Sequence, residues 1–376
     1  MVKKSITKKY NINGPVNIIR LTNGEKIVYI FGDLHINLEK QTECVYDKNI
    51  ESIDIDKFFR KIFKKNPDKK FDFFYEGYYN LDPKIDSKQQ NEILDNQIYT
   101  KNYFSQIIKL VFNNIDIIDN KIHTSKQFHN VRLHYFNFRN IIPHYIYLMN
   151  NSDNFYNLQY SNNYNNIISS FMIYNKLFIE IKDFLDSDKN SYIKKIKSIY
   201  NNKEIGEKII NVYNILIIDL LNNILKLIND TIKYIKNTPK LFDKYISIND
   251  KYELNKLIYI NINIIDELLS CLFSNLTDIY LVRRLLDKNY INNCIIFTGA
   301  YHMIDIVYIL IKYFDFKITH IANSDKEIDK GNIDNVNTII KKKDITNYDD
   351  IKFFTKYFYN NNYQCSNLFN FPDNLE

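Results

Sequence analysis

Six short runs of β-branched and aromatic residues recur along this chain of 376 residues. Each run has the length of one strand, and segments with apolar residues at three- and four-residue spacing separate most of them. The runs occupy residues 16–21, 26–31, 71–75, 131–136, 293–298 and 316–322. Because strands that alternate with helices pair into a mostly parallel sheet with helices on its faces, the pattern predicts an α/β fold with flanking helices.

The first two runs are joined by Thr22-Asn23-Gly24-Glu25. Asn-Gly is a strong hairpin signal, because a type I′ turn needs positive φ at both central positions. We therefore expect an antiparallel hairpin strand at the N-terminus of the sheet. Residues 54–65 then show helical spacing before the run at 71–75. A crossover helix joins parallel strands, so the runs at 26–31 and 71–75 should be parallel.

From about residue 150 to residue 289 the pattern is helical throughout, and Gly206 is the only glycine there. Apolar residues recur at three- and four-residue spacing, with joints expected near residues 187–188 and 237–239. This change of pattern predicts a discontinuous α/β core at 1–150 and 275–376. It also predicts a large all-helical insert or cap at 151–274, which offers a surface for a protein partner.

Four further segments carry weaker patterns. We expect a helix across residues 98–118, a polar loop at 323–337 and an amphipathic helix at 349–359. The final dozen residues are rich in Asn, and we expect them to be loosely held, as chain ends commonly are.

The net charge of +6 is mild, and the lysines are scattered over helical faces. Nucleic-acid binding proteins concentrate positive charge in a stripe, so no nucleic-acid partner is expected. The most apolar window, at 209–228, is interrupted by Asn and Asp. A membrane span needs about 20 nearly unbroken apolar residues, so none is expected. The N-terminus has no apolar segment of the kind found in signal peptides.

The four cysteines, Cys44, Cys271, Cys294 and Cys365, lie far apart and form no CxxC pair. This spacing excludes a zinc ribbon and is typical of a reducing compartment. With no signal peptide in view, we expect an intracellular, cytoplasmic protein.

Polar residues stand at the carboxyl ends of four predicted strands. Gly32-Asp33-Leu34-His35 follows the second run, Glu76 follows the third, and Arg139 follows the fourth. Gly299-Ala300-Tyr301-His302 follows the fifth run and repeats the Gly-x-x-His pattern. Sites in open α/β sheets form outside the carboxyl ends of strands, so these residues can converge. Only seven glycines occur, and small residues mark places where backbone or ligand comes close.

Two kinds of chemistry suit such a set. His35, Glu76 and His302 can hold a divalent metal such as Zn²⁺, Mn²⁺ or Co²⁺ and leave a position open for water. Without a metal, a carboxylate orients a histidine that takes a proton from water. Arg139 then stabilises the negative charge that develops on the attacked group.

Each residue also has a structural interpretation. Glu76 can simply lie at the N-terminus of a helix. Asp33 can cap the following helix or hydrogen-bond to His35 and orient it. Arg132 can pair with a carboxylate, and His134, in mid-strand, is as readily a hydrogen-bonded core histidine as a ligand.

The order of these motifs resembles the superfamily of erythromycin esterases, haem-binding ChaN-like lipoproteins and TraB/TIKI proteins. Members share a Gly-x-x-His near the N-terminus, a Glu after the next strand, an Arg after a later strand and a second Gly-x-x-His. Here these are Gly32 to His35, Glu76, Arg139 and Gly299 to His302. The resemblance covers about residues 15–145 and 275–322 and extends to uncharacterised proteins of large DNA viruses.

The resemblance implies an α/β hydrolase site that cleaves an ester without metal or a peptide with metal. One residue departs from the esterase branch, which has Gly-Glu where this chain has Gly32-Asp33. We therefore expect an enzyme that hydrolyses a small-molecule ester or a peptide, located in a virus-infected cell or a virion if the chain is viral. Two alternatives stay open. One is a non-catalytic structural or host-interaction protein with a relic site, and the other is a haem or iron-binding protein.

Overall fold

The computed structural model describes residues 10–34, 44, 51–78, 103–112, 115–118, 121–124, 127–139, 142–151, 155, 157–158, 163–237, 248–323, 330–342, 358, 365–368, 371–372 and 375. The chain divides into two compact units, which are described separately. The first unit joins Met1–Asn137 to Arg284–Glu376, and the second is Phe138–Arg283. The predicted boundaries, 150/151 and 274/275, both fall inside the second unit.

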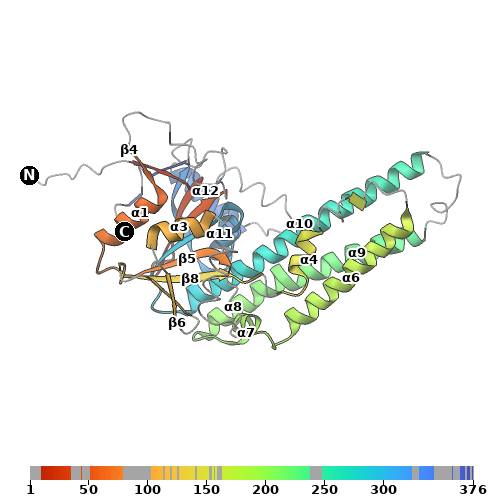
Figure 1. Ribbon diagram of the computed structural model, residues 1–376, viewed down its shortest axis with the longest axis horizontal. Helices are drawn as coiled ribbons and strands as arrows, with labels where there is room; N and C mark the ends of the chain where they lie inside the picture. The colour runs from red at the N-terminus through yellow and green to blue at the C-terminus, as the bar shows by residue number, and fades with distance from the viewer. Residues whose placement is uncertain are drawn as a thin grey trace, which may run out of the picture. The chain divides into compact units, whose positions relative to one another are not determined.

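A six-stranded sheet forms the centre of the first unit (Figure 1). Its order is β10-β2-β3-β9-β5-β8, and β3, β9, β5 and β8 run parallel. The strands are β2 (Asn17–Thr22), β3 (Ile27–Asp33), β5 (Phe71–Tyr78), β8 (Val131–Asn137), β9 (Asn293–Gly299) and β10 (Lys317–Asn323). β2 is antiparallel to both of its neighbours. The predicted α/β class, with a mostly parallel sheet and an N-terminal hairpin, is confirmed.

The hairpin turn differs from the one that Asn-Gly suggested. The strands pair up to Thr22 and Ile27, so the loop has four residues. Gly24 has a φ of +95°, but Asn23 is not among the described residues with positive φ. Asn23 Oδ1 instead accepts hydrogen bonds from the backbone N–H groups of Glu25 and Lys26, at 3.2 and 2.9 Å. The Asn side chain therefore closes an Asx-type turn rather than a type I′ turn.

The predicted parallel pair is parallel but not adjacent. Strand β4 (Glu51–Asp54) and the predicted helix, α1 (Ile55–Lys65), lie between β3 and β5 in the chain. However, β9 lies between these two strands and pairs with both of them. The central strand of the sheet therefore comes from the C-terminal part of the chain.

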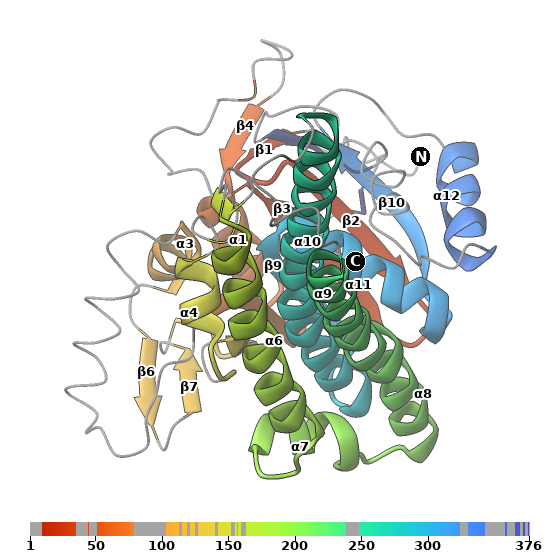
Figure 2. The same ribbon diagram turned by 90° about the vertical axis from the view of Figure 1, so that its right-hand side faces the viewer.

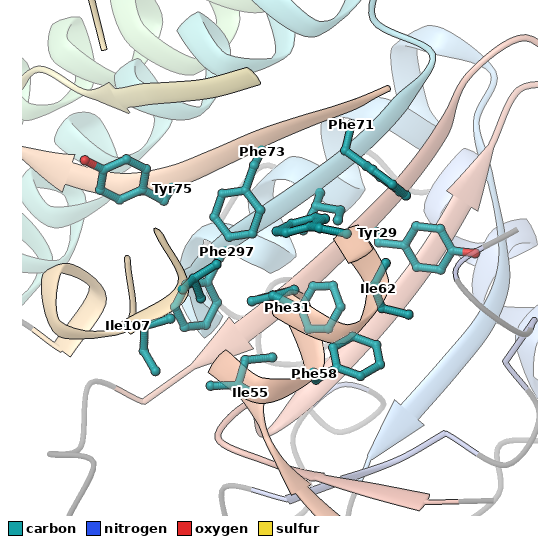
Figure 3. Close-up of a cluster of buried hydrophobic side chains, with 14 of the residues drawn as sticks. Tyr29, Phe31, Ile55, Phe58, Ile62, Phe71, Phe73, Tyr75, Ile107 and Phe297 are labelled. Atoms are coloured by element: carbon teal, nitrogen blue, oxygen red, sulfur yellow. The ribbon is translucent and has the colours of Figure 1, made fainter. Parts of the chain in front are cut away.

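Aromatic side chains fill the space between α1 and the sheet (Figure 3). Phe59 of α1 lies 4.9 Å from Phe31, 5.0 Å from Phe73 and 6.0 Å from Phe297, measured between ring centroids. Each such pair contributes about 0.5–1.5 kcal/mol beyond the burial of its surface. Helix α3 (Tyr103–Phe112) packs on the same face, while α11 (Ala300–Phe314) covers the other face (Figure 2).

A second, three-stranded sheet has the order β11-β1-β4. It is built from β1 (Tyr10–Asn13), β4 (Glu51–Asp54) and β11 (Cys365–Asn367). The final dozen residues were expected to be loose, and this expectation is wrong for those that the structure describes. β11 pairs with β1, Ser366 Oγ donates to the Pro15 carbonyl at 2.8 Å, and Leu375 is buried in the core.

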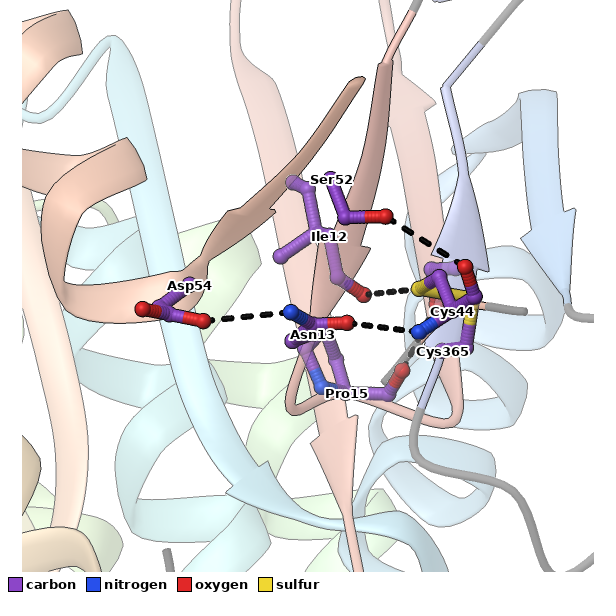
Figure 4. The surroundings of a disulfide bond; sticks show 8 residues. Ile12, Asn13, Pro15, Cys44, Ser52, Asp54 and Cys365 are labelled. Atoms are coloured by element: carbon purple, nitrogen blue, oxygen red, sulfur yellow. Dashed lines mark hydrogen bonds between the residues drawn. A yellow bond between two sulfur atoms is a disulfide. The ribbon is translucent and has the colours of Figure 1, made fainter. Parts of the chain in front are cut away.

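Cys44 and Cys365 form a disulfide beside this sheet, across a sequence separation of 321 residues (Figure 4). The Cys44 backbone N–H also donates to Asn13 Oδ1 at 2.9 Å. A large separation in the sequence therefore does not exclude a disulfide between these cysteines. Disulfides persist in oxidising environments, so the cysteine spacing no longer supports a reducing compartment.

Three local expectations also need correction. The helix expected across 98–118 ends at Phe112, and β6 (Ile115–Ile118) follows it and pairs with β7 (Lys121–Thr124). The loop expected at 323–337 contains the start of α12 (Lys330–Lys342). Its Ile333, Val336 and Ile340 are buried at helical spacing. The helix expected at 349–359 lies outside the described residues, except for Phe358.

The elements that the structure describes in the second unit are helices. Its elements are α4 (Tyr145–Asn150), α6 (Tyr164–Asp186), α7 (Ser191–Ser198), α8 (Lys203–Tyr213), the π-helix η5 (Asn214–Asp219), α9 (Leu220–Lys236) and most of α10 (Ile248–Asp287). Asparagine side chains cap three helices: Asn163, Asn190 and Asn202 accept backbone N–H groups at the starts of α6, α7 and α8. The predicted joint at 187–188 is confirmed, because α6 ends at Asp186.

Within the described residues, one stretch is long and apolar enough to cross a membrane by length and composition. It is Asn255–Asp287 of α10, and 33% of its most apolar 18-residue window is buried. The window expected to be apolar but buried, at 209–228, runs through α8, η5 and α9. It buries Ile209, Val212, Ile217, Leu221, Ile224 and Ile228.

A candidate site at the carboxyl ends of β5 and β9

Two predicted site residues meet where β5 and β9 end. The register of these parallel strands pairs Tyr75 with Phe297, so Glu76 lies beside Thr298 and Gly299. Helix α11 begins directly after Gly299, and His302 is its third residue. The His302 Nε2 atom lies 3.2 Å from Glu76 Oε1. Both side chains are buried, with 6% and 7% of their surfaces exposed.

Two hydrogen bonds from the end of β9 hold one oxygen of the Glu76 carboxylate. Its Oε2 accepts hydrogen bonds from Thr298 Oγ1 at 3.1 Å and from the Gly299 backbone N–H at 2.9 Å. The carboxylate thus lies at the N-terminus of α11, where the helix dipole stabilises negative charge. This position agrees with the structural interpretation of Glu76 and also fixes the carboxylate as a partner for His302.

The arrangement orients the His302 imidazole. The Glu76 carboxylate, 3.2 Å from Nε2, favours a proton on that nitrogen, so the lone pair of the neutral ring lies on Nδ1. The ring of Phe136, from β8, packs edge-on against His302 with centroids 6.4 Å apart. The Glu76 carboxylate and the Phe136 ring together restrict the His302 imidazole to one orientation, as a general base requires. Neither Thr298 nor Phe136 was among the predicted residues, although Thr298 directly precedes the second Gly-x-x-His motif.

The first Gly-x-x-His motif is described only in part. Gly32 and Asp33 end β3 and lie in register with Thr298 and Gly299 of β9. A Cβ atom on Gly32 would lie 2.8 Å from the Met303 sulfur and 3.4 Å from the Ala300 Cα atom. Gly32 therefore allows the start of α11 to approach β3. Asp33 is 1% exposed, and His35 lies outside the described residues.

Arg132 and His134 belong to a different cluster, around Asp72. This carboxylate is fully buried and accepts hydrogen bonds from Arg132 Nε and Nη2 at 2.7 and 2.6 Å and from His134 Nε2 at 2.7 Å. Asp72 precedes Glu76 by four residues on β5, which places it roughly 13 Å away along the strand. Arg132 and His134 thus lie near the amino ends of the strands. The sequence analysis missed Asp72, whose only signal was an acidic residue inside an apolar strand.

The charges of this cluster are fixed by burial and hydrogen bonding. Burial alone would raise the pKa of Asp72, but hydrogen bonds from His134 and Arg132, with the positive charge of the Arg132 guanidinium, hold that pKa below its ordinary value. Burial lowers the pKa of His134 by more than the hydrogen bond to Asp72 raises it. His134 is therefore neutral near pH 7 and is the core histidine of the structural interpretation.

Arg139 is half-buried and belongs to the second unit, where its backbone carbonyl accepts from the Ile142 N–H at 3.0 Å. Among the residues that the structure describes, no group of three or more His, Cys, Asp or Glu side chains could hold a metal ion. Glu76 and His302 are two members of the predicted ligand set, and His35, the third, is outside the described ranges.

The fold and the site define an α/β protein with a buried Glu–His pair at the carboxyl ends of parallel strands. The chain belongs to the family described as "Family of unknown function (DUF5847)", whose model matches residues 10–192 and 176–376.

Curated relatives span the whole chain. It is 28% identical to "Uncharacterized protein R706" of Acanthamoeba polyphaga mimivirus in an alignment 416 positions long. The alignment covers 92% of this chain and 96% of the relative. It is 29% identical to "Uncharacterized protein R160" of the same virus, covering 100% and 99% of the two chains. No solved structure matches. These findings support the viral part of the resemblance and give no support to the esterase, ChaN-like and TraB/TIKI part.

Proposed function

We propose that this protein is a hydrolase in which His302 activates water and Glu76 orients His302. The observation that carries the proposal is the buried Glu76–His302 pair, 3.2 Å apart, where β5 and β9 end. Sites of α/β proteins form at this edge of the sheet. The order of the Gly-x-x-His, Glu and Gly-x-x-His motifs, which resembles the erythromycin esterase, ChaN-like and TraB/TIKI superfamily, adds to it.

Each residue has a defined role in this mechanism. His302 takes a proton from water as the water adds to an ester or peptide carbonyl, and it returns that proton to the alcohol or amine that leaves when the C–O or C–N bond breaks. Glu76 then stabilises the imidazolium that forms, as a carboxylate partner does in other hydrolytic sites. His35 is a second base or, with Glu76 and His302, a ligand of a divalent metal. Arg139 stabilises the developing oxyanion.

The first test compares His302→Ala and Glu76→Gln with the parent protein on a panel of esters, lactones and peptides. Loss of a general base typically costs about 10²–10⁴-fold in rate, and we expect kcat/KM to fall within that range for His302→Ala. His129→Ala is the matched control, because His129 is exposed on the surface of the same unit. If His302→Ala and His129→Ala hydrolyse the panel equally well, His302 is not the base.

The role of metal is tested separately, by mass spectrometry of untagged protein. Near-stoichiometric zinc, manganese or cobalt in the parent, and none in the His35→Ala/His302→Ala double variant, would assign the histidines as ligands. Parent protein without metal, even after incubation with each ion, would leave the metal-free mechanism.

A second candidate is a non-catalytic protein in which the same pair is structural. The observation that favours it is the anchoring of Glu76 to Thr298 and Gly299, which ties β5 to the start of α11 whether or not any substrate binds. If the pair is only structural, Glu76→Gln should lower the melting temperature, and the parent protein should hydrolyse none of the substrates in the panel. Haem or iron binding through the histidines is the remaining alternative. Titration with haemin would then give a Soret band that His302→Ala lacks.

A further inference from the structure

Helix α10 carries a second apolar stripe besides the one that it buries. Its buried positions in the helical unit are Ile258, Ile262, Ile265, Leu269 and Leu272. Within the described residues, Ile260 and Ile264 remain 42% and 39% exposed, and Leu257, Leu268 and Cys271 are half-buried. These last five residues lie within an arc of about 80° on the helix surface, at about 100° per residue. We call them the α10 stripe.

The α10 stripe contains no charged residue and runs for about 21 Å along the helix, at 1.5 Å per residue. Helix α10 lies beside α6 and α9 (Figure 1). Asn261, between the stripe and the buried positions, donates to Thr231 Oγ1 of α9 at 2.9 Å. The stripe is therefore part of the outer surface of a well-anchored helix and not a frayed end.

The spacing of the stripe is symmetric about Ile264. Leu257 and Ile260 precede it by seven and four residues, and Leu268 and Cys271 follow it by four and seven. An antiparallel two-fold axis at Ile264 would place Ile264 against itself, Ile260 against Leu268 and Leu257 against Cys271 of a second copy. This is the self-complementary pattern that a two-fold interface requires. The steps between successive stripe residues are three, four, four and three, so all five lie on one face of the helix.

We propose that the α10 stripe is a homodimer interface in which two copies of α10 pack antiparallel about Ile264. Antiparallel packing sets the helix dipoles in the favourable sense. It also keeps the flanking Glu267 carboxylates about 9 Å apart along the axis, because each lies opposite Asn261 of the other copy. The five side chains alone cover less than the roughly 600 Å² per partner of a small specific interface, so we expect a weak dimer that flanking polar residues complete.

Sedimentation equilibrium of the full chain tests the interface directly. We expect the parent to dimerise at micromolar concentration and Ile264→Asp to weaken dimerisation at least tenfold, with little change in melting temperature because Ile264 is partly exposed. Ile173→Asp is the matched control, since Ile173 is 51% exposed on α6, and it should dimerise as the parent does. A parent that stays monomeric, or equal effects of the two substitutions, overturns the proposal.

Disulfide cross-linking then tests the orientation. In a Cys271→Ser background, Ile264→Cys should form a covalent dimer on mild oxidation, while Ser270→Cys, on the outer face of the same helix, should not. Leu257→Cys with the native Cys271 should cross-link only if the helices are antiparallel. A monomeric parent that sediments with phosphatidylcholine vesicles would show instead that lipid covers the stripe, and would overturn the dimer.

Discussion

At the scale of single residues, the sequence analysis found the polar groups but not all of their partners. Glu76 and His302 were predicted to converge, and they lie 3.2 Å apart because parallel pairing of β5 and β9 sets their strand ends side by side. Asp72 was missed because nothing in the sequence shows which strand faces a lone buried acid. Once β8 pairs with β5, Arg132 and His134 become the donors to that acid.

The first residue-scale prediction concerns the stability of this buried cluster. Asp72→Asn should lower the free energy of unfolding by about 1–3 kcal/mol, because a neutral amide replaces the buried carboxylate that accepts hydrogen bonds from Arg132 and His134. Asp68→Asn, at an exposed position, should change it by less than about 0.5 kcal/mol. Urea denaturation of both variants measures the difference. Equal midpoints for the two would mean that the cluster contributes nothing to stability.

Acidification should destabilise the same cluster. The folded-state pKa of His134 is below its ordinary value of 6.5, so the unfolded chain takes up a proton first as the pH falls. The contribution of His134 to the free energy of unfolding is therefore complete above pH 6.5 and declines below it. The pKa of Asp72 is also lowered by folding, so protonation of this carboxyl at still lower pH destabilises the folded protein further. His134→Gln should flatten the dependence of the melting temperature on pH between about 6.5 and 5. Some slope should remain, since burial also lowers the pKa of His320.

At the scale of elements, strands and helices could be predicted but their neighbours could not. All six strands of the main sheet were recognised from their apolar runs, and the hairpin of β2 and β3 followed from Asn23-Gly24. The position of β9 between β3 and β5 was not predictable, because the crossover rule fixes direction and hand and not adjacency. Strand β6 was read as the end of a helix, because its apolar residues also suit a helical period.

The approach of α11 to β3 gives an element-scale prediction. Gly32→Ala would place a methyl group 2.8 Å from the Met303 sulfur, and such overpacking typically costs about 1–3 kcal/mol. Met303→Ala alone should also destabilise, because it leaves a cavity. The double variant should lose less stability than the sum of the two single changes, since each relieves the defect of the other. Strict additivity in urea denaturation would show that Met303 is not what excludes a side chain at position 32.

At the scale of the whole molecule, the Cys44–Cys365 disulfide ties the C-terminal strand to a segment near the N-terminus. No spacing rule could pair these residues, because the ring that they close spans most of the chain. The closure of a loop this long restricts the unfolded chain and can stabilise the fold by up to about 5 kcal/mol.

Removal of the disulfide should therefore lower the melting temperature. Cys44→Ser/Cys365→Ser, or reduction of the parent, should lower it by several degrees, whereas Cys271→Ser should change it little. Of the four cysteines, two are in the disulfide, so the denatured, unreduced parent should take up two alkyl groups and the reduced parent four. Uptake of four groups without reductant would show that the bond is absent.

The central position of β9 also dictates when this protein can fold during its synthesis. Residues 10–137 supply β2, β3, β5 and β8, but β3 and β5 have no shared partner until residues 293–299 have left the ribosome. Until then both strands present open edges that could pair with strands of other nascent chains. Truncated chains that end before residue 293 should therefore aggregate, and full-length chains should depend on chaperones or on fast completion of synthesis to avoid the same fate.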